Sequence, residues 1–188
     1  AIDADGQHTL MLTVTDDSGN SSTQSVSFVI DTTTPSISFS GVEEGHYYNT
    51  DVMPVITVSD DNAGSVGITL DGTEYSSGTA IGTEGSHVLS VTATDLAGNS
   101  SIAQVTFHID KTAPSSTVVT GLPKYEDDLT YVTWDTGFEL SATDDGSGVS
   151  STEYRINGDT WTTYTQPFTL SGLVDGTVNV EYRSVDTA

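Results

Sequence analysis

The chain of 188 residues contains 27 acidic residues, 4 Lys or Arg and no Cys, which gives a formal net charge of −23 at pH 7. A surface of this charge repels nucleic acid phosphates and acidic membranes, so no nucleic acid partner is expected. No apolar segment approaches the ~20 residues of a membrane helix, so direct membrane insertion is not expected, and without Cys no disulfide supports the fold.

Residues 1–31 are expected to form a β-hairpin. Thr9–Thr15 and Val26–Ile30 both alternate in the period-2 manner of half-buried strands. The segment between them, Asp16–Asn20, contains Gly and Asn where a turn requires positive φ. Proline at position 35 cannot donate to a strand ladder, so the segment Asp31–Pro35 reads as a linker and a domain boundary.

Residues 32–110 contain a second copy of this hairpin. Gly85–Ser115 repeats Gly6–Ser36 at an offset of 79 residues, and 17 of the 31 positions are identical. A period of this length is that of a complete small domain. The short strands expected in it, separated by Gly, Asn and Asp clusters, predict a β-sandwich, with Tyr47 and Tyr48 in a loop. The expected strands are 36–40, 53–59, 66–70, 73–76, 79–82, 87–94 and 102–109.

Residues 111–188 repeat the plan with different middle strands, expected at 138–143, 151–156, 160–164 and 168–170. Asp175–Ala188 is a third, partial copy, 91 residues after the second. The sequence therefore predicts a hairpin from one module (1–31), a complete module (32–110) and a module lacking its last strand (111–188). Two explanations account for the missing strands. In the first, the protein is longer than this sequence and the additional residues supply them. In the second, Asn20–Asp31 of another copy pairs beside Val178–Val185. The first explanation is favoured, because the second leaves residues 1–18 without a role.

Several motifs resemble the immunoglobulin-like repeats of large bacterial and archaeal surface proteins. Residues 32–110 look like the generic version, and Tyr182–Ala188 is similar to the YRSVDTAGN segment of another repeat type. The resemblance covers essentially the whole chain and implies an all-β fold of tandem immunoglobulin-like antiparallel β-sandwiches. It also implies a stalk or spacer, sometimes with calcium between modules. The other motifs that carry it are Asp144–Val149, Glu153–Gly158, Trp161–Tyr164, Pro167-Phe168 and the two Asp-x-Thr-x-Pro linkers.

Aspartates are expected to converge where one module follows another. In a seven-stranded antiparallel sandwich, the chain enters at the end that also carries the B–C and F–G loops. The first junction would then gather Asp31, Asp60, Asp61, Asn62, Asp95 and Asn99. The second would gather Asp110, Asp144, Asp145 and Asp186, partly neutralised by Lys111. Ca²⁺ takes six to eight oxygen ligands of this kind. The alternative is that these residues are ordinary turn formers in solvated loops.

Other candidate sites have ordinary alternatives as well. Asn20 and Asn99 each begin an Asn-Ser-Ser glycosylation sequon, although Gly-Asn is also plain turn chemistry. Five aromatic residues would form a sugar-stacking platform if they shared an open face, and would otherwise pack the sandwich: Trp134, Tyr154, Trp161, Tyr164 and Tyr182. No Gly-x-Ser-x-Gly elbow and no ligand-spaced histidines occur, so an enzyme is not expected.

The function expected from the sequence is structural. Acidic modules in series would form a spacer, stalk, S-layer, filament or adhesin of an extracellular or cell-surface protein, without catalytic activity. The expected partners are neighbouring immunoglobulin-like modules of the same chain and other copies of it in a filament or surface layer. The competing hypothesis is a carbohydrate- or receptor-binding module attached to a secreted hydrolase.

Overall fold

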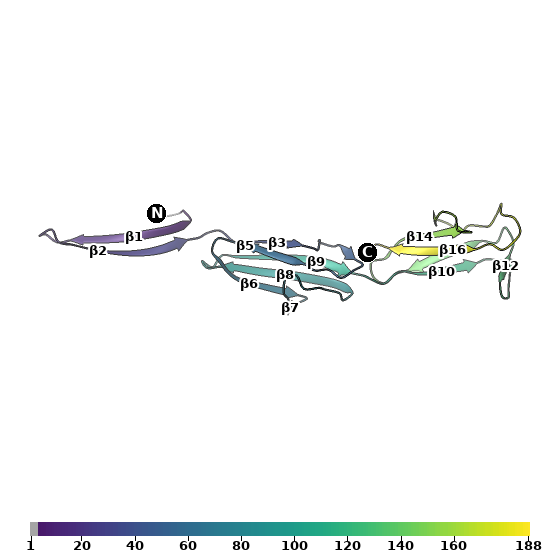
Figure 1. Cartoon of the computed structure of the whole chain (residues 1–188), viewed down its shortest axis with the longest axis horizontal. Helices are drawn as coiled ribbons and strands as arrows, with labels where there is room; N and C mark the ends of the chain where they lie inside the picture. Colours follow the sequence, from purple (N-terminus) through teal and green to yellow (C-terminus); the bar gives the residue numbers. More distant parts are fainter. Residues whose placement is uncertain (1–3) are drawn as a thin grey trace. The chain divides into compact units, whose positions relative to one another are not determined.

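The computed structural model describes residues 4–188, so residues 1–3 of the predicted hairpin lie outside the described part. Sixteen strands and no helix occur in the described residues (Figure 1), which confirms the all-β prediction. No helix long and apolar enough to cross a membrane is found among them. The chain forms two compact units, the first running to Gly45 and adding Val52–Ile81 and His87–Phe107. The second comprises His46–Asp51, Gly82–Ser86 and His108–Ala188. The division predicted at residues 31 and 110 differs from these units and stays a prediction.

The first unit begins with a two-stranded antiparallel hairpin of β1 (Gly6–Thr15) and β2 (Ser21–Ile30). All ten residues of each strand are paired, from Gly6 opposite Ile30 to Thr15 opposite Ser21. The Asp16 carboxylate closes the turn by accepting hydrogen bonds from the Ser18 and Asn20 amides, both at 2.9 Å. One face of the hairpin is apolar and remains 37 to 63% exposed at Leu10, Leu12, Val14, Val26 and Phe28.

The hairpin is followed in the chain by an immunoglobulin-like β-sandwich. One layer consists of two antiparallel strands, and the other contains four strands that neighbour one another in the order β9-β8-β6-β7, in which β6 pairs antiparallel with both β7 and β8. The strands of the first layer are β3 (Ser36–Ser40) and β5 (Val55–Ser59). Those of the second are β6 (Ala63–Leu70), β7 (Thr73–Glu74), β8 (Gly85–Asp95) and β9 (Ser100–Ile109).

The sandwich core follows the period-2 pattern of the sequence. Along β8, every second residue from His87 to Asp95 is buried and its neighbours are not. On this face Leu89, Val91 and Phe107 are fully buried, and Val42, Val52 and Ile81 add to the core. Complete burial of each of these large side chains stabilises the fold by roughly 1.5–3 kcal/mol.

The second unit contains the remaining strands. β4 (Tyr47–Tyr48) pairs in parallel with the last two residues of β9, and three further sheets follow, with the orders β10-β13, β11-β12 and β15-β14-β16. Phe138, Leu140 and Leu170 form their buried core. The strands are β10 (Ser115–Thr120), β11 (Lys124–Glu126), β12 (Thr130–Val132), β13 (Phe138–Thr143), β14 (Val149–Ile156), β15 (Thr162–Thr163) and β16 (Val180–Asp186).

Some local predictions are wrong. Tyr47 and Tyr48 are not in a loop but form β4. The strand predicted at 79–82 is reduced to a single bridge between Ile81 and Val52, and that at 168–170 to a bridge between Phe168 and Phe138. The hairpin of β11 and β12 was not predicted. All of these elements are two or three residues long or single bridges, too short to show a periodic pattern.

Candidate metal centres

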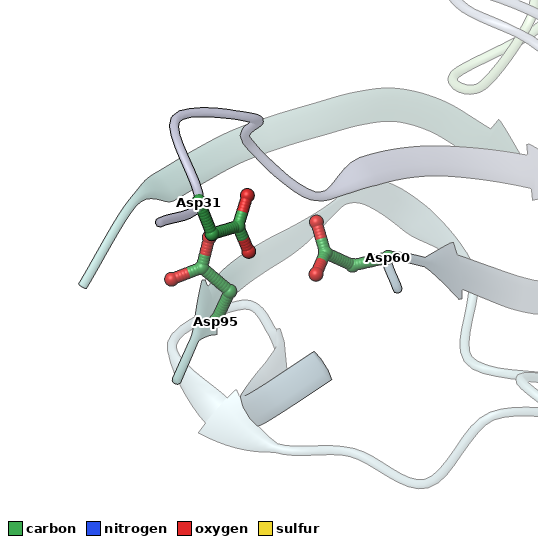
Figure 2. A group of neighbouring side chains, drawn as sticks. All are labelled: Asp31, Asp60 and Asp95. Carbon is green, nitrogen blue, oxygen red and sulfur yellow. The ribbon is translucent and has the colours of Figure 1, made fainter. Parts of the chain in front are cut away.

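Three aspartates converge in the first unit and are called the first aspartate cluster: Asp31, Asp60 and Asp95. Asp31 follows β2, Asp60 follows β5 and Asp95 is the last residue of β8. Figure 2 shows the three side chains directed into one small space. One carboxylate oxygen from each lies within 4.8 Å of the other two. These three residues therefore lie together, as the sequence predicts. Asp61, which the sequence also placed here, is exposed and lies outside the group.

Local turn chemistry fixes each carboxylate of the first aspartate cluster. Asp60 Oδ1 accepts the amide of Asn62 at 2.8 Å, and Asp31 Oδ1 accepts the amide of Thr33 at 3.0 Å. Asp95 Oδ1 accepts three amides, from residues 97, 98 and 99, at 2.7 to 2.9 Å. Such Asx turns hold an aspartate by one oxygen and leave the other to face a neighbour.

Two asparagine side chains join the first aspartate cluster. Asn62 Nδ2 donates to Asp31 Oδ2 at 2.8 Å. Asn99 Nδ2 donates to Asp95 Oδ2 at 2.7 Å and to the Asp31 carbonyl at 3.0 Å. Asp95 is only 5% exposed. Loss of solvation raises the pKa of its carboxyl, but the hydrogen bonds from the Asn99 side chain and from the turn amides outweigh that effect. The pKa of Asp95 is therefore lowered, and the carboxylate is charged at neutral pH.

The second unit contains an equivalent group, the second aspartate cluster: Asp110, Asp144 and Asp186. One oxygen from each again lies within 4.8 Å of the others, while Asp145 is exposed and outside the group. Asp144 Oδ1 accepts the amides of Gly146 and Gly148, at 3.0 and 2.7 Å. Asp110 Oδ2 accepts the Ser147 amide at 2.6 Å. Hydrogen bonding from Ser147 is the main cause of the lowered pKa of Asp110.

Glycine is required beside the second aspartate cluster. A Cβ atom at position 146 would collide with the carboxylate of Asp110, so only Gly lets the turn approach this closely.

Lys111 does not neutralise the second aspartate cluster, so that expectation is wrong. Its ammonium group donates to Asp51 Oδ1 and to the Gly82 carbonyl instead. None of the six clustered carboxylates forms an ion pair with Lys, Arg or His within the described residues.

The donor set of both clusters fits Ca²⁺. Ca–O distances of 2.3–2.6 Å allow two ligands of one ion to lie at most about 5 Å apart, and the clustered oxygens meet that limit. Three carboxylates at this separation repel one another unless a cation lies among them. Backbone carbonyls complete such sites, and Asn62 and Asn99 would add ligands by turning their amide oxygens inward. Each cluster therefore has the chemistry of a divalent cation site of hard oxygen ligands.

The linkers are also held by acidic residues that the sequence did not single out. Asp5 Oδ1 accepts the amide and hydroxyl of Thr32, at 3.1 and 2.8 Å, and Asp5 Oδ2 accepts the Thr33 hydroxyl at 3.0 Å. In the second unit, Glu84 accepts the Lys111 amide at 2.6 Å and the Thr112 hydroxyl at 3.0 Å. Asp5 and Glu84 are 79 residues apart, so the repeat offset is the signal that identifies them.

The two sequon asparagines differ in their surroundings. Both hydrogens of the Asn99 amide have acceptors, Asp95 Oδ2 and the Asp31 carbonyl, so a glycan on this nitrogen would displace at least one of them. Asn20 is exposed, and its Nδ2 donates to Asp16 Oδ2 at 2.9 Å. Glycosylation stays a prediction, and Asn20 is the more accessible acceptor.

Two of the five aromatic residues considered as a sugar platform have their rings covered by other side chains. Tyr154 stacks on Phe168 with ring centroids 3.8 Å apart. Trp161 is covered by the guanidinium groups of Arg155 and Arg183, at 4.6 and 4.2 Å from its ring. Trp134 is 63% exposed and is the one most open to solvent. Packing therefore occupies the faces of Tyr154 and Trp161.

A buried histidine lies at the start of the sandwich core in the first unit. His87 is 6% exposed, and its Nδ1 lies 2.8 Å from Asp71 Oδ2. Asp71 adopts a φ of 51° in the turn between β6 and β7, and its Oδ1 accepts the Val88 amide at 2.7 Å. Partial burial raises the pKa of Asp71, but the hydrogen bonds from Val88 and His87 outweigh it, so the pKa lies below its ordinary value of 3.8.

We predict that this pair makes the sandwich acid-sensitive. A carboxyl whose folded pKa is lowered stabilises the fold above its ordinary pKa and loses that contribution as pH falls through the folded value. Asp71→Asn keeps the left-handed backbone accessible but removes the titration. The variant is expected to unfold at lower denaturant concentration at neutral pH, with a smaller further loss below pH 3.8 than the unmodified chain. Equal acid sensitivity in both proteins would contradict the assignment.

Comparison with known proteins adds the following. No family model matches the chain, and no curated protein matches it either. Among solved structures it is similar to the fibronectin(III)-like modules of Clostridium thermocellum CbhA, at 12% identity over 80% of this chain and 86% of that chain, with a TM-score of 0.41. It is also similar to dimeric latent PorU from Porphyromonas gingivalis, at 13% identity over 98% of this chain and 27% of that chain, with a TM-score of 0.35. Neither similarity carries a functional assignment.

Proposed function

We propose that the chain is a non-catalytic spacer of immunoglobulin-like modules from an extracellular or cell-surface protein, and that calcium stiffens it. In this proposal the modules hold another part of the protein away from its attachment point. Their partners are neighbouring modules of the same kind, within a stalk, surface layer or filament.

The observation that carries the proposal is the repetition of one acidic arrangement. Each aspartate cluster combines a linker residue, the residue that follows the partner strand of the first strand (β5 after β3, β13 after β10) and the last residue of β8 or β16. In both clusters the carboxylates are held by turn amides through Oδ1 at corresponding positions, as in Asp31 with Thr33 and Asp110 with Thr112. Two copies of a costly assembly of like charges point to a shared cation rather than to coincidence.

Calcium suits the remaining properties of the chain. The net charge of −23 concentrates cations near the surface, and the first 110 residues contain no Lys or Arg that would compete for the carboxylates. A cation bound to a linker aspartate and to two loop aspartates would fix the linker in one conformation. This restriction is what a spacer needs, because its reach depends on stiffness.

The proposal is tested by calorimetric titration of the chain with Ca²⁺. Two ions per chain are expected. Asp60→Asn should remove the first site and Asp144→Asn the second, because each loses a carboxylate that faces the ion. The matched controls are Asp61→Asn and Asp145→Asn, which remove the same charge from the adjacent, exposed position. A chain that takes up no calcium, or loses it equally in all four variants, would disprove specific sites.

A further inference from the structure

A tight turn follows β14 in the second unit, and its two central residues are Asn157 and Gly158. Asn157 has a φ of 53° and Gly158 a φ of 80°, the pair of left-handed conformations that a type I′ turn requires. The Asp159 amide closes the turn by donating to the Ile156 carbonyl at 3.0 Å. Both central residues are exposed. The chain has six asparagines, and this is the only one that glycine follows.

The Asn157 carboxamide and the next backbone nitrogen are both accessible for reaction. Among the described residues, Asn157 Oδ1 accepts the Asn179 amide at 2.9 Å, and no acceptor takes a hydrogen from Nδ2. The Gly158 nitrogen likewise donates to no described acceptor. A side chain at position 158 would meet nothing within 4 Å of its Cβ atom, so the space beside this nitrogen is open. The nitrogen can therefore approach Cγ of the preceding residue.

The other asparagines lack this combination. In each of them the next residue carries a side chain, which crowds the backbone nitrogen. Asn179 is the closest match to Asn157, because it is exposed and its carbonyl accepts the Asn157 amide at 2.8 Å. It is followed by the β-branched Val180, however, the first residue of β16. Three others donate their carboxamide hydrogens to aspartate oxygens: Asn20, Asn62 and Asn99.

We propose that Asn157 is a site of spontaneous deamidation, which converts it to aspartate and isoaspartate. The Gly158 nitrogen attacks Cγ of Asn157 and loses its proton, a new N–Cγ bond closes a succinimide ring, and Nδ2 leaves as ammonia. Water then opens the ring. Cleavage of the new bond gives aspartate, whereas cleavage of the original peptide bond gives isoaspartate, with the backbone running through Cγ. The net reaction consumes one water and releases one ammonia, without an oxidant or a cofactor.

The folded turn slows this reaction without preventing it. Ring closure turns Asn157 out of its left-handed conformation. This movement breaks two surface hydrogen bonds, from Asp159 to Ile156 and from Asn179 to Asn157 Oδ1. The loss of two such bonds slows a reaction by roughly ten- to a hundredfold. Exposed turns open locally much more often than the whole domain unfolds. Conversion therefore proceeds from the folded chain.

The two products have different effects on the structure. Aspartate keeps the backbone unchanged and retains an oxygen for the Asn179 amide. Isoaspartate adds a methylene group to the backbone of a turn whose length is fitted to β14 and β15. Trp161 follows this turn, under the guanidinium groups of Arg155 and Arg183. Isoaspartate is therefore expected to displace Trp161. Neither aspartate cluster takes part, so the reaction is independent of calcium binding.

Peptide mapping by mass spectrometry tests the proposal on the folded chain, after several weeks at mildly alkaline pH. Trypsin cleaves after Arg155 and Arg183, so one peptide contains both Asn157 and Asn179. Asn157 should convert about tenfold faster or more, a difference of about 1.4 kcal/mol in activation free energy. Equal conversion at the two positions would overturn the proposal. A folded chain that keeps Asn157 intact while the urea-unfolded chain loses it would overturn it as well.

Two variants complete the test. Asn157→Gly keeps the left-handed turn but has no carboxamide, so no acid should form at this position. Asn157→Asp supplies the aspartate product alone. In a Trp134→Phe background, Trp161 is the only tryptophan. The isoaspartate fraction, separated by chromatography, should then show a shifted Trp161 emission, whereas Asn157→Asp should emit like the unmodified chain. Unchanged emission from the isoaspartate fraction would refute the displacement of Trp161.

Discussion

Saturating Ca²⁺ is expected to raise the melting temperature of the chain by roughly 10 °C or more, since a ligand at 100 times its Kd stabilises by about 2.7 kcal/mol per site. The physical reason is that the ion relieves repulsion among three carboxylates that only the folded chain brings together. Differential scanning calorimetry with calcium and with a chelator measures the effect.

Two controls separate a bound ion from general screening. Matched ionic strength with sodium alone should give a small rise, because it screens the net charge of −23 without occupying a site. Asp95→Asn should abolish the calcium-dependent shift of the first sandwich, whereas Asp61→Asn should keep it. A melting temperature indifferent to chelation would argue for plain turn chemistry in both clusters.

A second large effect is expected from a pair of matched core substitutions. Phe107→Ala should destabilise the first sandwich by about 3–5 kcal/mol, because Phe107 is fully buried and its removal leaves a cavity. Phe28 holds the same repeat position on β2 and even has a comparable ring contact, with His8 at 5.8 Å against His87 at 5.6 Å for Phe107.

Phe28→Ala is nevertheless expected to change the unfolding of the sandwich by less than about 0.5 kcal/mol, since Phe28 is 37% exposed and lies on the hairpin. The two variants are compared by denaturant unfolding at low protein concentration, monitored by far-ultraviolet circular dichroism. Similar losses in both would mean that the hairpin face is covered in solution and unfolds together with the sandwich.

Much of the fold was predictable because its long strands are regular. The alternation of His87, Leu89 and Val91 in sequence is the alternation of buried residues along β8. The repeat then extends this assignment to β1 and part of β16. In contrast, Tyr47 and Tyr48 form a two-residue parallel pairing with β9, and no periodic signal accompanies a contact between residues 61 positions apart.

The candidate site was predictable to a similar degree. Strand parity places a linker aspartate near the loops of the next sandwich, and the side-chain oxygens of Asp31, Asp60 and Asp95 do converge. Strand parity cannot distinguish Asp60 from Asp61, because the two are neighbours in one turn. It therefore also predicts Asp61 as a member of the cluster, although Asp61 is exposed. The contact of Glu84 with Thr112 was not anticipated either, because a single acidic residue before a strand has no characteristic spacing.

The linker contacts have a mechanical consequence. Asp5 holds Thr32 and Thr33 from the preceding side, while Asp31 is held by Asn62 and Asn99 from the following side. The linker is therefore hydrogen-bonded to the residues on both sides of it and has no free length to extend. Tension applied along the chain therefore reaches these short polar contacts directly, and the linker cannot lengthen until they break.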